Sequence, residues 1–360
     1  MRSILLLLFL LVPALVLSTP LPAQTPPGVV LPNASYATNP GPRNNNIPFS
    51  WQPTRYQQLF HNQDVGSKAN LFNNLQLRPN NNYGSPSYGG HMVNLTIKLG
   101  PTTVAPSAAT GTFATNNPTP ITVLDKVWVQ MPRFRTFNVT DWQVTIPFAR
   151  PFPWPGGTNH FCVEVVNWMN TNQNALFTYP LDATNTGQTT RIYASGNPTA
   201  ATGSVGMNYG LIMRFCTILS TEAWFQDYGS DCPGSTNQPM IMIARDAPRL
   251  GLNLEIALIQ GPPSGSAILG YGRNRSRWGP LALPFDLTPF GARGCSLNCE
   301  LLGLVTTPIS ASGDANQQFT LPNVPGLLGS RLCFQWLAND AQANPLGLIT
   351  SQGGEARLGQ

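Results

Sequence analysis

Apolar side chains at every second position constrain the fold of this chain more than any other feature of its sequence. In Met92–Leu99 the residues Val, Leu, Ile and Leu recur at every second position, and Leu252–Gln260 and Arg331–Ala338 repeat the pattern. A period of two places successive side chains on opposite faces of a β-strand. Each run is therefore predicted to be a strand with one face on a core and the other toward water, as in antiparallel sheets.

Strand-like segments of this kind recur along the chain. A first group comprises Arg55–Phe60, Met92–Leu99, Ile121–Gln130, Phe137–Phe148, Phe161–Trp168 and Tyr209–Thr217. A second group comprises Pro239–Ile243, Leu252–Gln260, Ser266–Gly272, Cys299–Thr306, Gln317–Leu321, Arg331–Ala338 and Glu355–Leu358. The 35 Pro and 33 Gly residues provide turns, whereas the Glu–Lys pairs of long surface helices are scarce. The predicted fold is all-β, with two antiparallel β-sandwich domains of jelly-roll or Ig-like type.

The N-terminal segment predicts export. Arg2 precedes the apolar run Ile4–Val12, and the segment Leu21–Ala23 provides a cleavage site after Ala23. Residues 1–23 therefore have the pattern of a secretory signal peptide. No later segment reaches about 18 uninterrupted apolar residues, which argues against a membrane span. We therefore expect a secreted, extracellular or cell-envelope protein.

The remaining chain divides by composition. Residues 24–52 are rich in Pro and Asn and are expected to form a disordered leader. One sandwich is expected at 53–219 and a second at 228–360, with a linker at 220–227 between them.

The second half of the chain carries short motifs that resemble a known module. They are Tyr228–Ser235, Pro248–Gly251, Pro284–Leu287, Gly294–Leu297, Pro322–Gly329, Cys333–Trp336 and Asn344–Gly347. Together they resemble the GC-containing β-sandwich module that ends large families of exported bacterial proteins of unknown function. Asp231 stands where similar modules usually have Gly. Further cues, in Arg55–Phe60, Phe72–Arg78 and Phe113–Asn117, resemble the sandwich domain often placed ahead of this module. The resemblance implies architecture and export, and no chemistry.

The six cysteines are expected to be structural crosslinks, because disulfides persist outside the reducing cytosol. Six cysteines allow about 15 pairings. The favoured pairs are Cys162 with Cys216, Cys232 with Cys295, and Cys299 with Cys333. The second of these joins two Gly-flanked turns that the module resemblance highlights, and closing its loop of about 64 residues would stabilise the fold by about 4 kcal/mol.

No catalytic residue, cofactor or metal ligand is assigned from the sequence. The acids that could form a glycosidase-type pair are Asp125, Asp141, Glu164, Glu222, Asp227, Asp231 and Asp246, but spacing alone does not identify such a pair. The three histidines, His61, His91 and His160, are far apart in the sequence. No acidic calcium loop and no Gly-x-Ser-x-Gly elbow is present.

The net charge of +5 does not by itself indicate a nucleic-acid partner. The densest basic cluster is Arg273, Arg275 and Arg277, which lies between predicted strands. A solvated loop is the favoured interpretation, and no nucleic-acid binding is expected.

Aromatic residues provide the one indication of a ligand. Trp51, Trp142, Trp154, Trp168, Tyr179 and Tyr193 could form a flat platform for sugar rings. Trp154, in the expected Pro-rich turn Pro151–Gly157, is the candidate expected to be exposed, whereas Trp142 and Trp168 lie in strand-like runs, where an aromatic side chain usually fills the core.

Three functions follow from these observations. The leading hypothesis is a secreted or cell-envelope, non-catalytic structural or interaction protein. A carbohydrate-binding or adhesive protein that contacts an extracellular glycan through Trp154 is the alternative. An extracellular hydrolase is the third hypothesis. An extracellular glycan or an envelope or surface protein is the expected partner.

Overall fold

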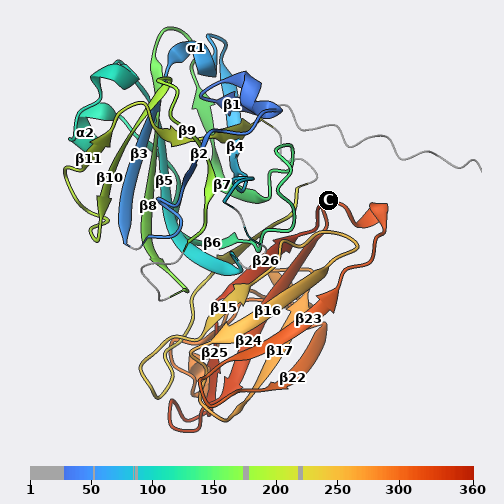
Figure 1. Cartoon of the computed structure of the whole chain (residues 1–360). Helices are drawn as coiled ribbons and strands as arrows, with labels where there is room; N and C mark the ends of the chain where they lie inside the picture. The colour runs from blue at the N-terminus through green and yellow to red at the C-terminus, as the bar shows by residue number, and fades with distance from the viewer. Residues whose placement is uncertain (1–27, 52, 84, 86–87, 173–177, 218–221) are drawn as a thin grey trace, which may run out of the picture.

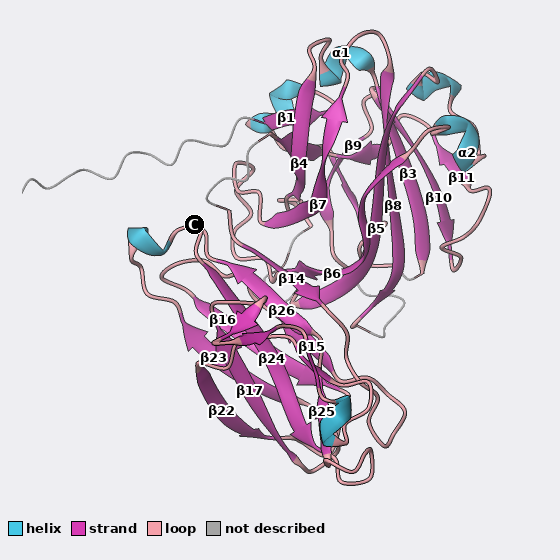
Figure 2. Ribbon diagram, turned by 180° about the vertical axis from the view of Figure 1, so that it is seen from behind, coloured by secondary structure: helices cyan, strands magenta, loops and turns pink. Residues whose placement is uncertain are grey.

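The computed structural model describes residues 28–51, 53–83, 85, 88–172, 178–217 and 222–360. The expected signal peptide, 1–23, lies outside the described residues. The described chain is all-β, as predicted, and its two α-helices, α1 (Asn62–Val65) and α2 (Phe113–Asn116), are four residues long. Figures 1 and 2 show that strands build both halves of the molecule.

One sheet of twelve strands runs through both halves of the molecule. Its spatial order is β11 (Ser204–Gly206), β10 (Thr189–Ser195), β3 (Thr54–Phe60), β8 (His160–Asn170), β5 (His91–Thr102), β6 (Ile121–Met131), β14 (Trp224–Tyr228), β26 (Gly353–Arg357), β24 (Arg331–Asn339), β17 (Ser266–Gly272) and β22 (Gly303–Pro308). The twelfth strand, β25 (Leu348–Thr350), pairs with β24 beside this path.

Smaller sheets cover this sheet. In the N-terminal half they are β1 (Gly28–Leu31), β13 (Met213–Cys216), β4 (Asn70–Leu77) and β7 (Val144–Trp154), and β12 (Gly210–Leu211), β9 (Leu181–Thr184) and β2 (Arg43–Asn45). In the C-terminal half they are β15 (Ile241–Ala244), β16 (Asn253–Ile259) and β23 (Ala315–Thr320), with the pairs β18 (Arg277–Trp278)–β19 (Leu281–Ala282) and β20 (Phe285–Asp286)–β21 (Ser296–Leu297).

The alternating runs fill two hydrophobic cores. Val93, Leu95, Ile97 and Leu99 of β5 are buried in the first core. Leu254, Ile256 and Leu258 of β16 are buried in the second core, together with Phe334 and Trp336 of β24. The period of two therefore predicted the inward faces of these strands correctly.

Strand β14 joins the two halves. It includes residues 224–227 of the segment 220–227 that was expected to be a linker. It pairs with β26 from Trp224 to Tyr228 and with β6 through Gln226 and Val129. The backbone N–H of Trp128 also donates a hydrogen bond to the Asp227 carboxylate, at 2.6 Å. The sheet thus continues from one half to the other, and Figure 2 shows β6, β14 and β26 side by side.

The prediction of a disordered leader at 24–52 is wrong for the part of it that the structure describes. Strand β1 pairs with β13, and β2 pairs with β9. Leu31, Ile47 and Phe49 are buried in the first core. Pro and Asn suggested disorder, but these apolar side chains have a core to enter and the backbone has sheet edges to pair with.

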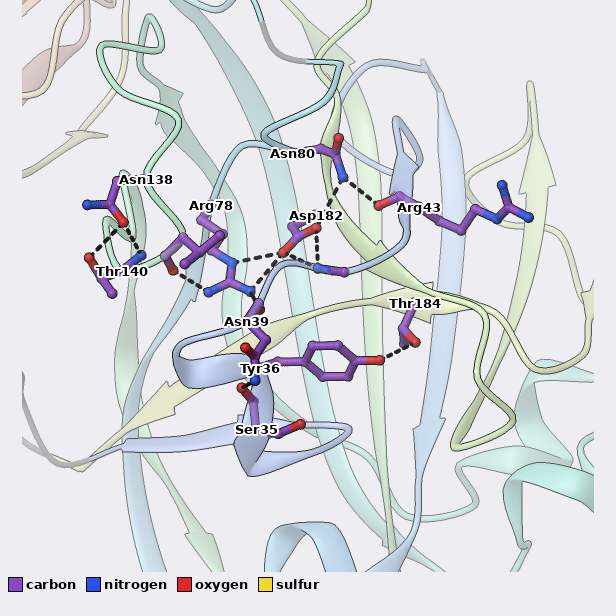
Figure 3. Close-up of polar contacts among 12 residues, drawn as sticks. Ser35, Tyr36, Asn39, Arg43, Arg78, Asn80, Asn138, Thr140, Asp182 and Thr184 are labelled. Atoms are coloured by element: carbon purple, nitrogen blue, oxygen red, sulfur yellow. Dashed lines mark hydrogen bonds and ion pairs between the residues drawn. The ribbon is translucent and has the colours of Figure 1, made fainter.

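A buried ion pair fixes this N-terminal segment. The Arg78 guanidinium lies 2.8 Å from the Asp182 carboxylate, and Arg78 also donates a hydrogen bond to the backbone oxygen of Asn39 at 2.7 Å. Asp182 accepts hydrogen bonds from the backbone N–H of Gly41 and the side chain of Asn80. Figure 3 shows Arg78 and Asn80 contacting Asp182, and Arg78 also reaching Asn39.

The Pro-rich segment Pro151–Gly157 is not a turn throughout, contrary to prediction. Strand β7 continues to Trp154, and the chain turns only at Gly156, where φ is 74°. Because β7 is an edge strand of its sheet, the missing N–H groups of its prolines cost few ladder hydrogen bonds.

Candidate functional site

Trp154 is buried, so its predicted exposure to a sugar is wrong. Only 1% of its surface is accessible, and its indole packs edge to face against Phe161 with ring centroids 5.3 Å apart. Its Nε1–H donates a hydrogen bond to the backbone oxygen of Gly66 at 3.1 Å. Because β7 continues through the prolines, Trp154 falls in phase with Phe152 and points into the same core.

The other candidate aromatic residues do not form one platform. Trp142 is buried and contacts two guanidinium groups, with Arg78 at 4.8 Å and Arg214 at 4.7 Å from its ring centres. Tyr179 is fully buried. Trp51 and Tyr193 contact each other edge to face, at 6.4 Å.

Trp168 lies in a different setting, on the wall of a pocket of about 340 Å³ between the two halves. The lining residues are Pro53, Trp128, Trp168, Met169, Asn170, Thr171, Ile241, Ile259 and Gln260. Trp128 comes from β6, and Trp168 and Met169 come from β8. Ile241 belongs to β15, and Ile259 ends β16. Both tryptophans are half-buried.

Polar contacts hold Trp168 in place. Its Nε1–H donates a hydrogen bond to the hydroxyl of Thr96 on the neighbouring strand β5, at 2.9 Å. That hydroxyl donates to Asp125 and accepts from the backbone N–H of Lys126. The Lys126 ammonium group lies 4.7 Å from the centre of the Trp168 ring. The indole therefore has a fixed orientation on the pocket wall.

Gln260 completes the pocket from the C-terminal half and has two unusual features. Its backbone has φ of 61°, in the left-handed region that residues other than Gly, Asn and Asp seldom adopt. Its side-chain Oε1 is buried and has no hydrogen-bond partner among the described residues. Buried polar atoms normally have a partner, so this Oε1 is an unsatisfied acceptor that is shielded from solvent.

Sequence reasoning missed Trp128 and Gln260. Trp128 had a usable signal, because Val127 and Val129 face inward and the residue between them must face outward. Gln260 had no such signal in the sequence. Its left-handed backbone depends on how β16 ends, and Gln is not one of the residue types that mark a turn.

Most of the acids named in the sequence have structural partners. Glu164 lies 3.0 Å from Arg55 and 3.2 Å from Lys98. Asp141 pairs with Arg249, and Glu222 with Arg214, both at 3.1 Å. Asp246 pairs with Arg135 at 3.3 Å beside a second open pocket, of about 580 Å³, where Arg133 pairs with Glu255.

Asp227 is the one of these acids with a large pKa shift. Burial raises its pKa to about 8, and the nearby charge of Asp231 contributes in the same direction. Asp227 and Asp231, two of the acids considered for a hydrolase, are four residues apart in the sequence. One Asp227 oxygen, however, accepts the hydrogen bond from the Trp128 N–H that joins the halves.

One of the three predicted disulfides is present. Cys232 and Cys295 are bonded, with their Cα atoms 4.8 Å apart. Both residues are buried in the second core, so the bond joins the start of the C-terminal half to its centre.

The predicted bond between Cys162 and Cys216 is wrong. Both thiols are free and buried. Cys162 packs with Leu59, Phe113 and Ile192 in a small cluster apart from the main core. The Cys216 thiol donates a hydrogen bond to the Gln76 side chain at 3.2 Å.

Cys299 and Cys333 are also unbonded in the structure, contrary to prediction, although their side chains are neighbours. Burial raises the pKa of Cys299, and the hydrogen bond from Cys299 lowers the pKa of Cys333. The backbone oxygen of Asn274 lies 3.3 Å from the Cys333 sulfur, and that of Glu300 lies 3.1 Å from the Cys299 sulfur. Each thiol is thus held by the turn next to it.

The fold brings His61 and His160 together, with ring centroids 5.4 Å apart. His160 Nδ1 accepts the backbone N–H of Asn62 at 3.2 Å. Among the described residues, no group of three or more His, Cys, Asp or Glu side chains is placed to hold a metal ion.

The basic loop has a structural partner. Arg275 lies 3.3 Å from Glu355 and 5.4 Å from the ring centre of Tyr228, although Arg275 is exposed, as Arg273 and Arg277 are.

Comparison with known proteins adds no assignment: no family model and no curated protein matches the chain. In the part of the chain that the structure describes, no helix has both the length and the apolar character needed to cross a bilayer.

Proposed function

We propose that the chain is a secreted or cell-envelope protein that acts as a rigid, non-catalytic interaction unit. The continuous sheet carries this proposal, because β14 pairs with both β6 and β26 and so joins the described parts of the two halves by strand pairing. The Cys232–Cys295 bond adds a crosslink of the kind expected outside the cytosol. The motifs of the C-terminal half support membership in the exported bacterial families that they resemble.

The use of the charged side chains also supports a non-catalytic role. Buried acids such as Glu164 and Asp182 lie against arginines, which hold strands or loops together. A partner protein or glycan would then be recognised on a surface that the sheet keeps in a fixed shape.

Expression of the full chain in a bacterial host, followed by fractionation and N-terminal sequencing, tests this proposal. We expect the exported protein to begin at Gln24 and to carry the Cys232–Cys295 bond in mass mapping without reduction. An uncleaved chain retained in the cytosol, with both cysteines reduced, would overturn it.

A further inference from the structure

A group of arginine and aromatic side chains lies at the edge of the N-terminal half that β10 and β11 form. It comprises Arg43, Trp51, Arg191, Tyr193 and Tyr209, and we call it the Arg191 surface. The Arg191 guanidinium lies 4.0 Å from the ring centre of Tyr209 and 5.2 Å from that of Tyr193. Trp51 in turn contacts Tyr193 edge to face. Figure 1 shows β10 and β11 at the outer edge of this half.

Neighbouring residues fix the orientation of this surface. Gly206 of β11 pairs with Arg191 of β10, and a Cβ atom at Gly206 would lie 3.0 Å from Arg191 Nε. The glycine therefore lets the arginine side chain lie across the neighbouring strand. The Tyr209 hydroxyl donates a hydrogen bond to the backbone oxygen of Asn44, which holds its ring beside β2. A guanidinium stacked on such rings still has the N–H groups at its rim to donate.

The two arginines of the surface have no carboxylate partner. Neither side chain forms an ion pair or a hydrogen bond with a described residue. Arg191 Nε is buried, but the two terminal nitrogens of this half-buried side chain are not. Arg43 is exposed, and Figure 3 shows its guanidinium pointing away from Asp182. Both groups can thus donate to a ligand from solvent.

The sequence around the surface leaves its positive charge unbalanced. Residues 28–63 and 183–217, which supply all five side chains, contain no Asp or Glu. Burial raises the pKa of Tyr209, but the charges of Arg191 and Arg43 both lower it, so both act at this ring. A concentration of uncompensated positive charge attracts an anionic partner.

The position of Arg191 next to a sheet edge favours a peptide as that partner. Strand β11 is the last strand of the large sheet, and among the described strands it pairs only with β10. Gly203 bonds to Gly111 at one end, which leaves the edge of Ser204–Gly206 open to an extended chain. Such a chain would pass beside Gly206, where no side chain separates it from Arg191. Arg, Tyr and Trp are also the residue types enriched at protein interfaces.

We propose that the Arg191 surface binds an extended acidic segment of a partner protein. The segment lies along β11, and one of its carboxylates accepts hydrogen bonds from the terminal nitrogens of Arg191. Arg43 provides a second positive charge for the same segment. This inference rests on the proposed function, because it names the contact surface of an interaction protein and the chemistry of its partner.

The test uses the mature full chain and a short fluorescein-labelled peptide of alternating Glu and Thr, with binding measured by fluorescence anisotropy. We expect the peptide to bind at about 0.01 M salt and to bind more weakly at about 0.15 M, because the Debye length falls from about 30 Å to about 8 Å. The same peptide with Lys in place of Glu should not bind.

Arginine variants locate the binding site. Arg43→Gln and Arg191→Gln should each weaken peptide binding about threefold or more, and the double variant should weaken it further. Arg273→Gln is the matched control: it removes one exposed arginine from the C-terminal half and should leave the affinity unchanged. The Arg43 side chain makes no bond that folding requires, so Arg43→Gln should keep the thermal stability of the wild type.

Two results would overturn the inference. One is that the acidic peptide fails to bind at low salt, or binds the Arg43 and Arg191 variants as tightly as Arg273→Gln. The other is that polygalacturonate, the second probe, binds through Arg43 and Arg191 when the peptide does not, since the partner would then be an acidic polysaccharide. Export and cleavage after Ala23 are measured separately, so loss of peptide binding alone would leave the proposed function standing.

Discussion

The rings of Phe161 and Phe215 contact each other edge to face across the N-terminal half, with centroids 5.2 Å apart. Phe161 lies in β8 of the large sheet and Phe215 in β13 of the covering sheet. Because side chains alternate along a strand, the residue after each Phe points to the opposite face. Those residues are Cys162 and Cys216, which explains why the two sulfurs do not meet.

We predict that Cys162 and Cys216 stay reduced in the folded exported protein. Burial raises the pKa of Cys162 well above its usual range and that of Cys216 to about 12, so little thiolate forms near neutral pH. Iodoacetamide should modify neither residue until the protein is unfolded, as read by mass spectrometry of peptides. Rapid modification of either thiol under native conditions would contradict the structure.

The same alternation shows how far the sequence could predict the fold. The phase of β5 and β16 followed directly from their apolar residues, and so did the all-β class. The phase of Cys162 was also readable, because Phe161 and Val163 are the apolar positions of β8. Pairing cysteines by strand alone, without regard to the face of each strand, led to the wrong bond.

Other features depended on tertiary structure. The burial of Trp154 required β7 to be an edge strand that tolerates proline, and local composition does not reveal strand order. The pocket required Trp128 and Gln260, which come from different halves, to line one cavity, and this depends on the pairing of β14 with strands of both halves. Only the outward position of Trp128 was accessible from periodicity.

The Cys232–Cys295 bond should account for a large share of the stability of the C-terminal half. The bond closes a loop with a sequence separation of 63. On the chain-entropy model its loss costs about 4 kcal/mol, so Cys232→Ala/Cys295→Ala should lower the free energy of unfolding by about that amount. Urea unfolding followed by tryptophan fluorescence measures the change.

Reductant provides the control for this prediction. It should destabilise the wild type to a similar extent and leave the double variant unchanged. If the double variant still loses stability in reductant, a further crosslink exists, and the free thiols of Cys299 and Cys333 in the structure are contradicted.

Asp227 should make stability depend on pH. Burial raises its pKa to about 8 in the folded protein, above the value of about 3.9 for an unfolded Asp. Folding therefore favours the protonated carboxyl. The contribution of Asp227 is most favourable below about pH 4 and is lost as the pH rises toward about 8.

Asp227→Asn removes this dependence while keeping an oxygen to accept the Trp128 N–H. The variant should be more stable than the wild type by about 2 kcal/mol at pH 7, a figure reduced because part of the side chain contacts water. The difference should shrink toward pH 4, as measured by urea unfolding across the pH range. The exposed Asp286 is the control, since its pKa is lowered by Thr288 and Asp286→Asn should give no stabilisation. An equal effect of Asp227→Asn at every pH would contradict the shift.

The Arg78–Asp182 pair should be the main fastening of the N-terminal segment. Both side chains are almost completely buried, and together they bind the backbone at Asn39 and Gly41. Burial raises the pKa of Asp182 although Arg78 opposes the shift, so the carboxylate depends on its partner. Arg78→Met leaves a buried acid without that partner and should cost about 3 to 5 kcal/mol.

Limited proteolysis distinguishes this local role from a general loss of stability. In Arg78→Met, cleavage within residues 28–50 should become faster than cleavage in the C-terminal half. Arg331→Met is the matched control, because Arg331 is 46% exposed beside Glu355 and the loss of an exposed pair costs about 1 kcal/mol or less. In the double variant Arg78→Met/Asp182→Leu the unpaired acid is gone, so part of the stability should return. If Arg78→Met and Arg331→Met were equally stable and equally resistant to protease, the ion pair would not be what holds the N-terminal segment in place.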